Sequence, residues 1–156
     1  MKKLFAILLL TGTLLACNNH QQAGNKAAID TADADHDQPG TTAEKLVLNN
    51  GAKWKVDIST NNNVRNLQAI LEKFSGGSDK SLTAYKKAGD DLQQGLNKMI
   101  RECKMKGPDH EALHKWLEPL INLVAKFKQV PDAAAAAQSL DAIREQVDIF
   151  PQYFEL

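Results

Sequence analysis

Residues 82–103, which read LTAYKKAGDDLQQGLNKMIREC, determine the fold class of this chain. The less polar positions in this stretch recur at alternating intervals of three and four residues, and this spacing places them on one face of an α-helix. They are Leu82, Tyr85, Gly89, Leu92, Leu96, Met99 and Cys103. Because charged and amide side chains fill most positions between them, the stretch predicts a long helix with one buried face, ending at Gly107.

The same spacing recurs on both sides of this stretch. One helical pattern precedes it and stops at the glycine pair 76–77, a second begins at Pro108, and a third lies between Pro131 and Pro151. The apolar positions of these patterns are Val64, Leu67, Leu71 and Phe74; Leu113, Leu117, Leu120, Val124 and Phe127; and Ala136, Leu140, Ile143, Val147 and Phe150. Four amphipathic helices joined by short links predict a mainly α fold, specifically an antiparallel four-helix bundle.

Residues 45–57, which precede the helices, show a period of two that is typical of a β-hairpin with one buried face. A two-residue turn at Asn50-Gly51 would pair Leu48 with Lys53, whereas a three-residue turn pairs Leu48 with Ala52. We expect the three-residue turn, because it brings the apolar side chains of both strands together. The sequence thus predicts a short N-terminal β-hairpin beside the bundle.

The N-terminus has the pattern of an export signal, with Lys2-Lys3 before an apolar run over residues 4–15. The residues L-L-A-C that end at Cys17 resemble the lipobox of bacterial lipoproteins. This resemblance implies a signal peptide over 1–16 and lipidation of Cys17. Residues 17–43 hold almost no large apolar side chain, so we expect the lipidated cysteine to begin a flexible polar tether over 17–43, followed by a folded domain over 44–156.

The lipobox resemblance also implies a location. The chain would be exported and attached through its lipid to the membrane of the bacterial cell envelope, at the periplasmic face or at the cell surface. Residues 103–117, CKMKGPDHEALHKWL, and 48–57, LNNGAKWKVD, are similar to an uncharacterised family of small helical lipoproteins of diderm bacteria. That family resemblance spans most of the folded part and implies no activity.

One cluster in the folded part combines thiol, thioether and imidazole side chains within 16 consecutive residues. Its members are Met99, Cys103, Met105, His110 and His114. These are ligand types of copper and zinc, and two histidines four residues apart share one face of a helix. A turn near residues 106–108 would bring Cys103 level with both histidines on the next helix. We therefore predict an envelope-anchored lipoprotein that binds a soft transition metal, copper or zinc, through this cluster.

Other functional classes find less support in the sequence. Lys+Arg and Asp+Glu both number 19, so there is no overall basic field for nucleic acid. The chain lacks a Gly-rich phosphate loop and the G-x-S-x-G and H-E-x-x-H motifs, so we expect no nucleotide cofactor and no enzymatic activity. The main alternative is a metal-free structural or interaction module of the envelope with an unidentified partner protein. A haem-binding bundle with Met99 and a histidine as axial ligands ranks last, because C-x-x-C-H is absent.

Overall fold

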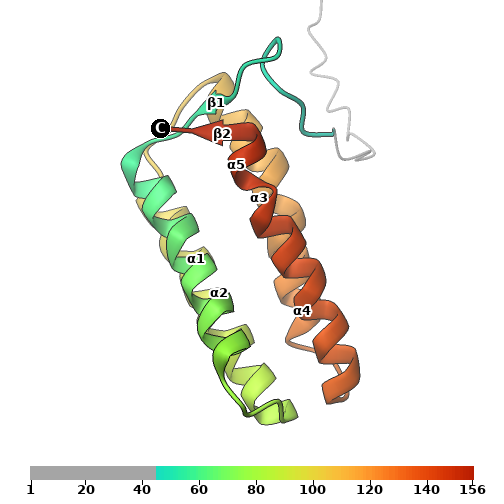
Figure 1. The fold of residues 1–156 in the computed structure, drawn as a ribbon. Coiled ribbons are helices and arrows are strands. Elements are labelled where there is room, and N and C mark those ends of the chain that lie inside the picture. Colours follow the sequence, from blue (N-terminus) through green and yellow to red (C-terminus); the bar gives the residue numbers. More distant parts are fainter. Residues whose placement is uncertain (1–44) are drawn as a thin grey trace, which may run out of the picture. The chain divides into compact units, whose positions relative to one another are not determined.

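The computed structural model describes residues 45–156, and this part of the chain is mainly helical (Figure 1). Its long helices are α1 (Ile58–Gly76), α2 (Leu82–Glu102), α3 (Pro108–Phe127) and α4 (Ala133–Asp148). A short helix, α5 (Phe150–Tyr153), and two short strands, β1 (Trp54–Lys55) and β2 (Phe154–Glu155), complete it. The mainly α class is confirmed. The predicted signal peptide (1–16) and the lipidated cysteine with its tether (17–43) lie outside the described residues.

Three of the long helices begin at side chains that accept hydrogen bonds from the first turn. Asp57 accepts from the backbone N–H of Thr60 at 2.6 Å, and Ser81 and Asp132 take the same role before α2 and α4. Helix α3 instead starts with Pro108, which has no backbone N–H. In the first turn this removes no hydrogen bond, because N–H groups there have no acceptor within the helix. The preceding Gly107 has φ 69°, a left-handed conformation that glycine adopts without strain. Local sequence thus determines where these helices start.

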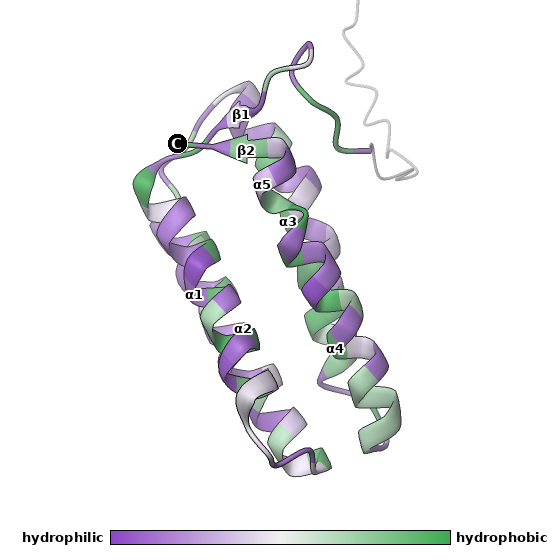
Figure 2. Cartoon of the chain, in the orientation of Figure 1, coloured by the Kyte–Doolittle hydropathy of each residue, from purple (hydrophilic) through white to green (hydrophobic). Residues whose placement is uncertain are grey.

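The apolar stripes of the four long helices meet in one core (Figure 2). Helix α1 packs along α2 and α3 packs along α4, and α2 also contacts both α3 and α4. The predicted apolar positions Leu92, Leu96 and Met99 of α2 are buried there. Gly95 faces α1 so closely that a Cβ at this position would lie 2.7 Å from Leu67 Cδ2. Helices α1 and α2 therefore approach closely at Gly95.

The predicted N-terminal β-hairpin is not confirmed. Antiparallel pairing among the described residues is limited to one bridge, between Asn49 and Ala52, which encloses Asn50 and Gly51 with φ values of 50° and 89°. The expectation of a three-residue turn is therefore wrong, because these two residues form a two-residue turn. Beyond the turn, the chain leaves the hairpin path, and β1 pairs in parallel with β2 at the end of the chain.

The parallel pairing explains why the hairpin does not extend. Val56 donates its backbone N–H to the carbonyl of Glu155 at 2.9 Å, and Phe154 is buried beside it. The indole Nε1 of Trp54 donates to the carbonyl of Val47 at 2.7 Å. Val56 is thus buried beside the distant C-terminal segment and Trp54 is held by the segment just before it, whereas Leu48 stays partly exposed.

Candidate functional site

The sulfur-containing residues of the predicted metal site belong to the interior and to helix ends. Met99 is buried in the core, and Cys103 follows the last residue of α2 and packs, half-buried, against the core. The backbone N–H of Cys103 donates to the carbonyl of Met99 at 3.0 Å. The Sδ of Met105 accepts a hydrogen bond from the hydroxyl of Thr60 at 3.5 Å. Packing and hydrogen bonding within the domain therefore account for all three side chains.

The two histidines lie together on the outer side of α3. The Nε2 atoms of His110 and His114 are 3.1 Å apart, and the two rings are nearly perpendicular. The Nδ1 of His114 lies 3.8 Å from Oε1 of Glu118 one turn further on. This stripe of side chains runs beside the buried stripe that includes Leu113 and Leu117.

The predicted copper or zinc site is wrong. No group of three or more His, Cys, Asp and Glu side chains that could hold a metal ion exists among residues 45–156. The sequence-based prediction matched Cys103 to His110 and His114 in height along the helices but ignored rotation about their axes. Each residue of a helix turns by about 100°, so His114 lies more than a quarter turn from the core-facing Leu113. Met99 lies on the buried face of α2, and Cys103 packs half-buried against the core just after this helix ends.

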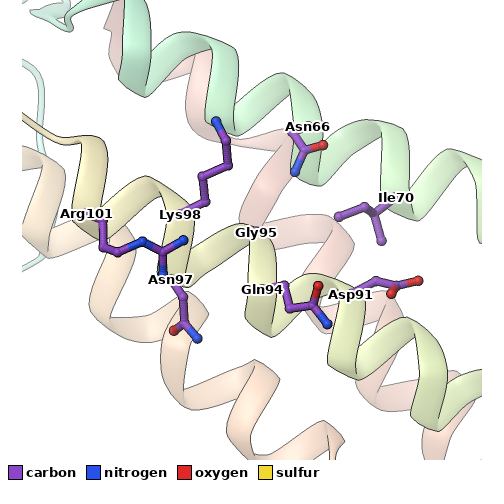
Figure 3. A pocket seen from close by; sticks show the side chains of 8 residues that line it. All are labelled: Asn66, Ile70, Asp91, Gln94, Gly95, Asn97, Lys98 and Arg101. Atoms are coloured by element: carbon purple, nitrogen blue, oxygen red, sulfur yellow. The ribbon is translucent and has the colours of Figure 1, made fainter.

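The surface between α1 and α2 carries a polar hollow of about 460 Å³ (Figure 3). Asn66 and Ile70 reach into it from α1, and the other lining residues come from α2. Those are Asp91, Gln94, Gly95, Asn97, Lys98 and Arg101. Gly95 lies at the base of the hollow, where a side chain would meet Leu67 and Asn66. The missing side chain therefore allows the two helices to approach and leaves space above them.

A second hollow, of about 510 Å³, adjoins the first toward the link between the two helices. Both hollows include Ile70 and Asp91, so they are neighbours, and we call the two together the α1–α2 groove. The second hollow is lined by Ile70, Lys73, Phe74, Gly77, Ser78, Asp79, Thr83, Ala84, Lys87, Ala88 and Asp91. Neither hollow contains an imidazole or a thiol, so the lining offers binding groups rather than an evident nucleophile and base pair.

Several charges along the α1–α2 groove are already paired. Lys87 contacts Asp91 at 3.0 Å, and Lys98 contacts Glu102 at 2.7 Å. Hydrogen bonds from Lys98, and from the buried Asn63, lower the pKa of Glu102 below its ordinary value. Asn63 thereby ties the polar edge of the groove to the core between α1 and α2.

Other polar groups in the α1–α2 groove have no partner in the described part of the chain. Lys73 and Arg101 form no ion pair with any of residues 45–156, and the amides of Asn66 and Gln94 form no hydrogen bonds there. Arg101 helps the Lys98 and Asn63 hydrogen bonds to lower the pKa of Glu102, whereas Lys73 and the two amides can bind a ligand without breaking an existing interaction. Two of the four side chains are cationic, and two can both donate and accept hydrogen bonds.

No motif in the sequence indicated this groove. The sequence feature that corresponds to the groove is the polar pair Gln93-Gln94 followed by Gly95, next to the apolar stripe of α2. Gly95 is buried because Leu67 of α1 packs over it, and that contact depends on how the two helices are rotated. Comparisons with protein-family models, curated proteins and solved structures find no match for this chain. No helix of residues 45–156 combines the length and the hydrophobicity needed to cross a membrane.

Proposed function

We propose that this chain is a non-enzymatic interaction module of the bacterial cell envelope. In this proposal the chain is exported, lipidated at Cys17, and held at the membrane by its acyl groups. The support is the export pattern ending in the L-L-A-C lipobox, together with a described domain that carries an open groove between α1 and α2. Stable anchoring by two or more acyl chains would leave the helical domain free to meet a second envelope protein.

The four long helices are proposed to form an antiparallel four-helix bundle that acts as a rigid platform. Three observations support this arrangement: the close packing of α1 with α2 and of α3 with α4, the links of a few residues between successive helices, and the single core. Residues held on packed helices keep their positions better than residues on loops do. The bundle would therefore present the α1–α2 groove in one shape.

The α1–α2 groove is the proposed binding surface, and its occupant is an extended acidic segment of another envelope protein. The observation that carries this proposal is the presence, along the α1–α2 groove, of cations that form no ion pair and amides that form no hydrogen bond with the described residues. Asn66 and Gln94 can hydrogen-bond to a peptide main chain, and Arg101 can bind a carboxylate with two parallel bonds. Lys73, in the second hollow, supplies another positive charge for the segment.

Site-specific photocrosslinking in cells tests this function. A photoreactive amino acid replaces Gln94 in the α1–α2 groove or, as a matched control, Gln138, an exposed glutamine on α4. We expect one protein adduct from position 94 and none from position 138, with the adduct lost when Arg101→Glu is added. Equal adducts from both positions, no adduct, or an adduct unaffected by Arg101→Glu would contradict the proposal.

A second measurement tests the chemistry of the partner. The segment crosslinked to position 94 is identified by mass spectrometry and synthesised as a peptide, and its affinity for the purified chain is measured by calorimetry. We expect an acidic segment whose affinity falls at least tenfold with Arg101→Glu, because a hydrogen-bonded charge pair is replaced by repulsion. A neutral or basic segment would overturn the assignment of the groove.

A further inference from the structure

The exposed large apolar side chains of the described residues gather at one end of the helical domain. They are Val47 (59% exposed), Leu48 (39%), Ile58 (70%), Ile100 (51%) and Leu156 (58%). They belong to the segment before β1, the first residue of α1, the last turn of α2 and the residue after β2 (Figure 2). We call this end the strand end, because β1 and β2 lie there, and no large apolar side chain is comparably exposed elsewhere in residues 45–156. Grouped exposure of this kind marks an interaction surface.

The strand end also carries lysines whose ammonium groups form no ion pair or hydrogen bond with the described residues. They are Lys45, Lys53, Lys104 and Lys106, all exposed. The acidic side chains there are mostly occupied: Asp57, Glu102, Asp109 and Glu155 each accept hydrogen bonds or form an ion pair within the domain, and Glu111 is the exception. The groups available to an external partner are therefore mainly apolar and cationic.

We infer that the strand end docks on a membrane surface that contains anionic phospholipid. The exposed apolar side chains enter the boundary between headgroups and acyl chains, while the four lysines contact phosphate groups. Exposed apolar side chains together with lysines at one end of the domain match the two chemistries of such a surface, acyl chains and phosphate groups. The groove begins near this end at Arg101 and runs along α1 and α2 to the link between them, so most of its length lies outside the docked surface.

The inference rests on the proposed acylation of Cys17, because the anchor supplies the local concentration. Lys45, the first described residue, lies at the strand end, and 27 residues separate it from Cys17. Even fully extended, this spacer spans at most about 95 Å. Because the anchor keeps the strand end at a high effective concentration near the membrane, a few side chains are enough for docking. A domain without an anchor would need many more.

Spin-label accessibility on the anchored protein tests the docking. The acylated full chain carries Cys103→Ser and one new label site, either Ala52→Cys at the strand end or Ser78→Cys in the link between α1 and α2. Both sites are exposed, and neither belongs to the apolar patch. In vesicles of phosphatidylethanolamine and phosphatidylglycerol, we expect the ratio of oxygen to nickel-chelate accessibility to be severalfold higher at position 52 than at position 78.

Charge reversal separates docking from simple proximity to the bilayer. Each lysine near an anionic surface contributes roughly fivefold to binding. We therefore expect the accessibility ratio at position 52 to fall to that at position 78 in the triple variant Lys53→Glu, Lys104→Glu, Lys106→Glu. The wild-type chain in phosphatidylcholine vesicles should show an intermediate ratio. Equal ratios at positions 52 and 78 in the anionic vesicles would overturn the inference.

Two further outcomes are distinguishable. Dipolar broadening at position 52 that persists in detergent would show that a second copy of the chain covers the strand end, and it would overturn membrane docking. Mass spectrometry of the N-terminal peptide reports acylation of Cys17 separately. An acylated chain with a water-exposed label refutes docking alone, whereas a chain without acyl groups overturns the proposed anchoring and, with it, the docking.

Discussion

Trp116 of α3 and Gln146 of α4 exchange two hydrogen bonds. The indole Nε1 of Trp116 donates to the carbonyl of Gln146 at 2.8 Å, and Nε2 of Gln146 donates to the carbonyl of Trp116 at 2.8 Å. The Trp116 ring is fully buried and meets Phe150 edge-on, with the ring centres 4.9 Å apart. Because each side chain bonds to the backbone of the other helix, this pair sets the position of α3 along α4.

We expect Trp116→Phe to lower the free energy of unfolding by roughly 2–3 kcal/mol, since it removes a buried hydrogen bond and leaves a void. Gln146→Ala should cost about 1 kcal/mol, because only the second bond is lost. Urea unfolding followed by circular dichroism measures both changes. The control is Gln138→Ala on the exposed face of α4, which should leave stability nearly unchanged. Equal effects of Gln138→Ala and Gln146→Ala would contradict a role for the exchanged bonds.

Gly95→Ala should destabilise the domain by about 1 kcal/mol. The new Cβ would lie 2.7 Å from Leu67 Cδ2, and the strain of moving a buried leucine exceeds the gain of roughly 1 kcal/mol in helix propensity. Thermal unfolding of the purified chain measures the change. Gly76→Ala is the matched control, because nothing lies within 4 Å of a Cβ there and the substitution should be neutral or stabilising. A stabilised Gly95→Ala variant would show that α1 and α2 separate without cost.

Asp57→Ala should cost about 1–2 kcal/mol at pH 7, because the cap of α1 is lost. Partial burial raises the pKa of Asp57, but hydrogen bonds from Thr60, Ser59 and Lys104 outweigh burial and hold the pKa below its ordinary value of 3.8. The ionised form is thus favoured by folding, so its contribution is complete above the ordinary pKa and disappears as the pH falls through 3.8 and then through the lowered folded pKa.

Unfolding free energies measured between pH 7 and pH 2.5 test this dependence. The difference between the wild-type chain and Asp57→Ala should be constant down to about pH 5 and should shrink below it. Asp141→Ala, at an exposed position of α4, provides the comparison and should give a small difference that changes little with pH. If the difference in unfolding free energy between the wild-type chain and Asp57→Ala grew as the pH falls, the pKa of Asp57 would be raised by folding rather than lowered.

Cys17→Ser should abolish acylation and release the chain from the membrane fraction, whereas Cys103→Ser should leave the chain there. The two cysteines are the only ones in the chain, so the pair is a matched comparison. Metabolic labelling with a fatty acid, together with fractionation of the cells, measures both effects. Acyl label retained in Cys17→Ser would refute the lipobox assignment.

The local pattern of the sequence was enough to predict the four long helices, although α2 ends at Glu102 rather than at the predicted Gly107. The spacing of three and four residues in α2, Pro108 at the start of α3 and the glycines at the end of α1 act within a few residues of the positions they affect. Local chemistry also favoured a turn at Asn50-Gly51. The three-residue turn was predicted because it would cover Leu48 with a neighbouring strand. This prediction was wrong, and Leu48 is partly exposed.

The candidate site could not be predicted in the same way. The metal prediction compared positions along two helices, but side chains meet only if both helices are also rotated toward each other. His110 is only half-buried and His114 is exposed, beside the core stripe of α3. The α1–α2 groove depends on the contact between Gly95 and Leu67, which belong to different helices. Rotation and contact of this kind arise from the packing of the whole core.

The sequence by itself determined the mainly helical class, the positions of the four long helices and the export pattern that ends at Cys17, since each depends on neighbouring residues. Only the tertiary structure decided that β1 pairs with β2 across 100 residues of chain, that Trp116 bonds to Gln146, and that unpaired polar groups line one groove. The physical reason is that the helical period of the sequence shows which face of each helix is apolar. The rotation of each helix about its axis, and the residues it contacts, are set only when all four apolar faces are buried together.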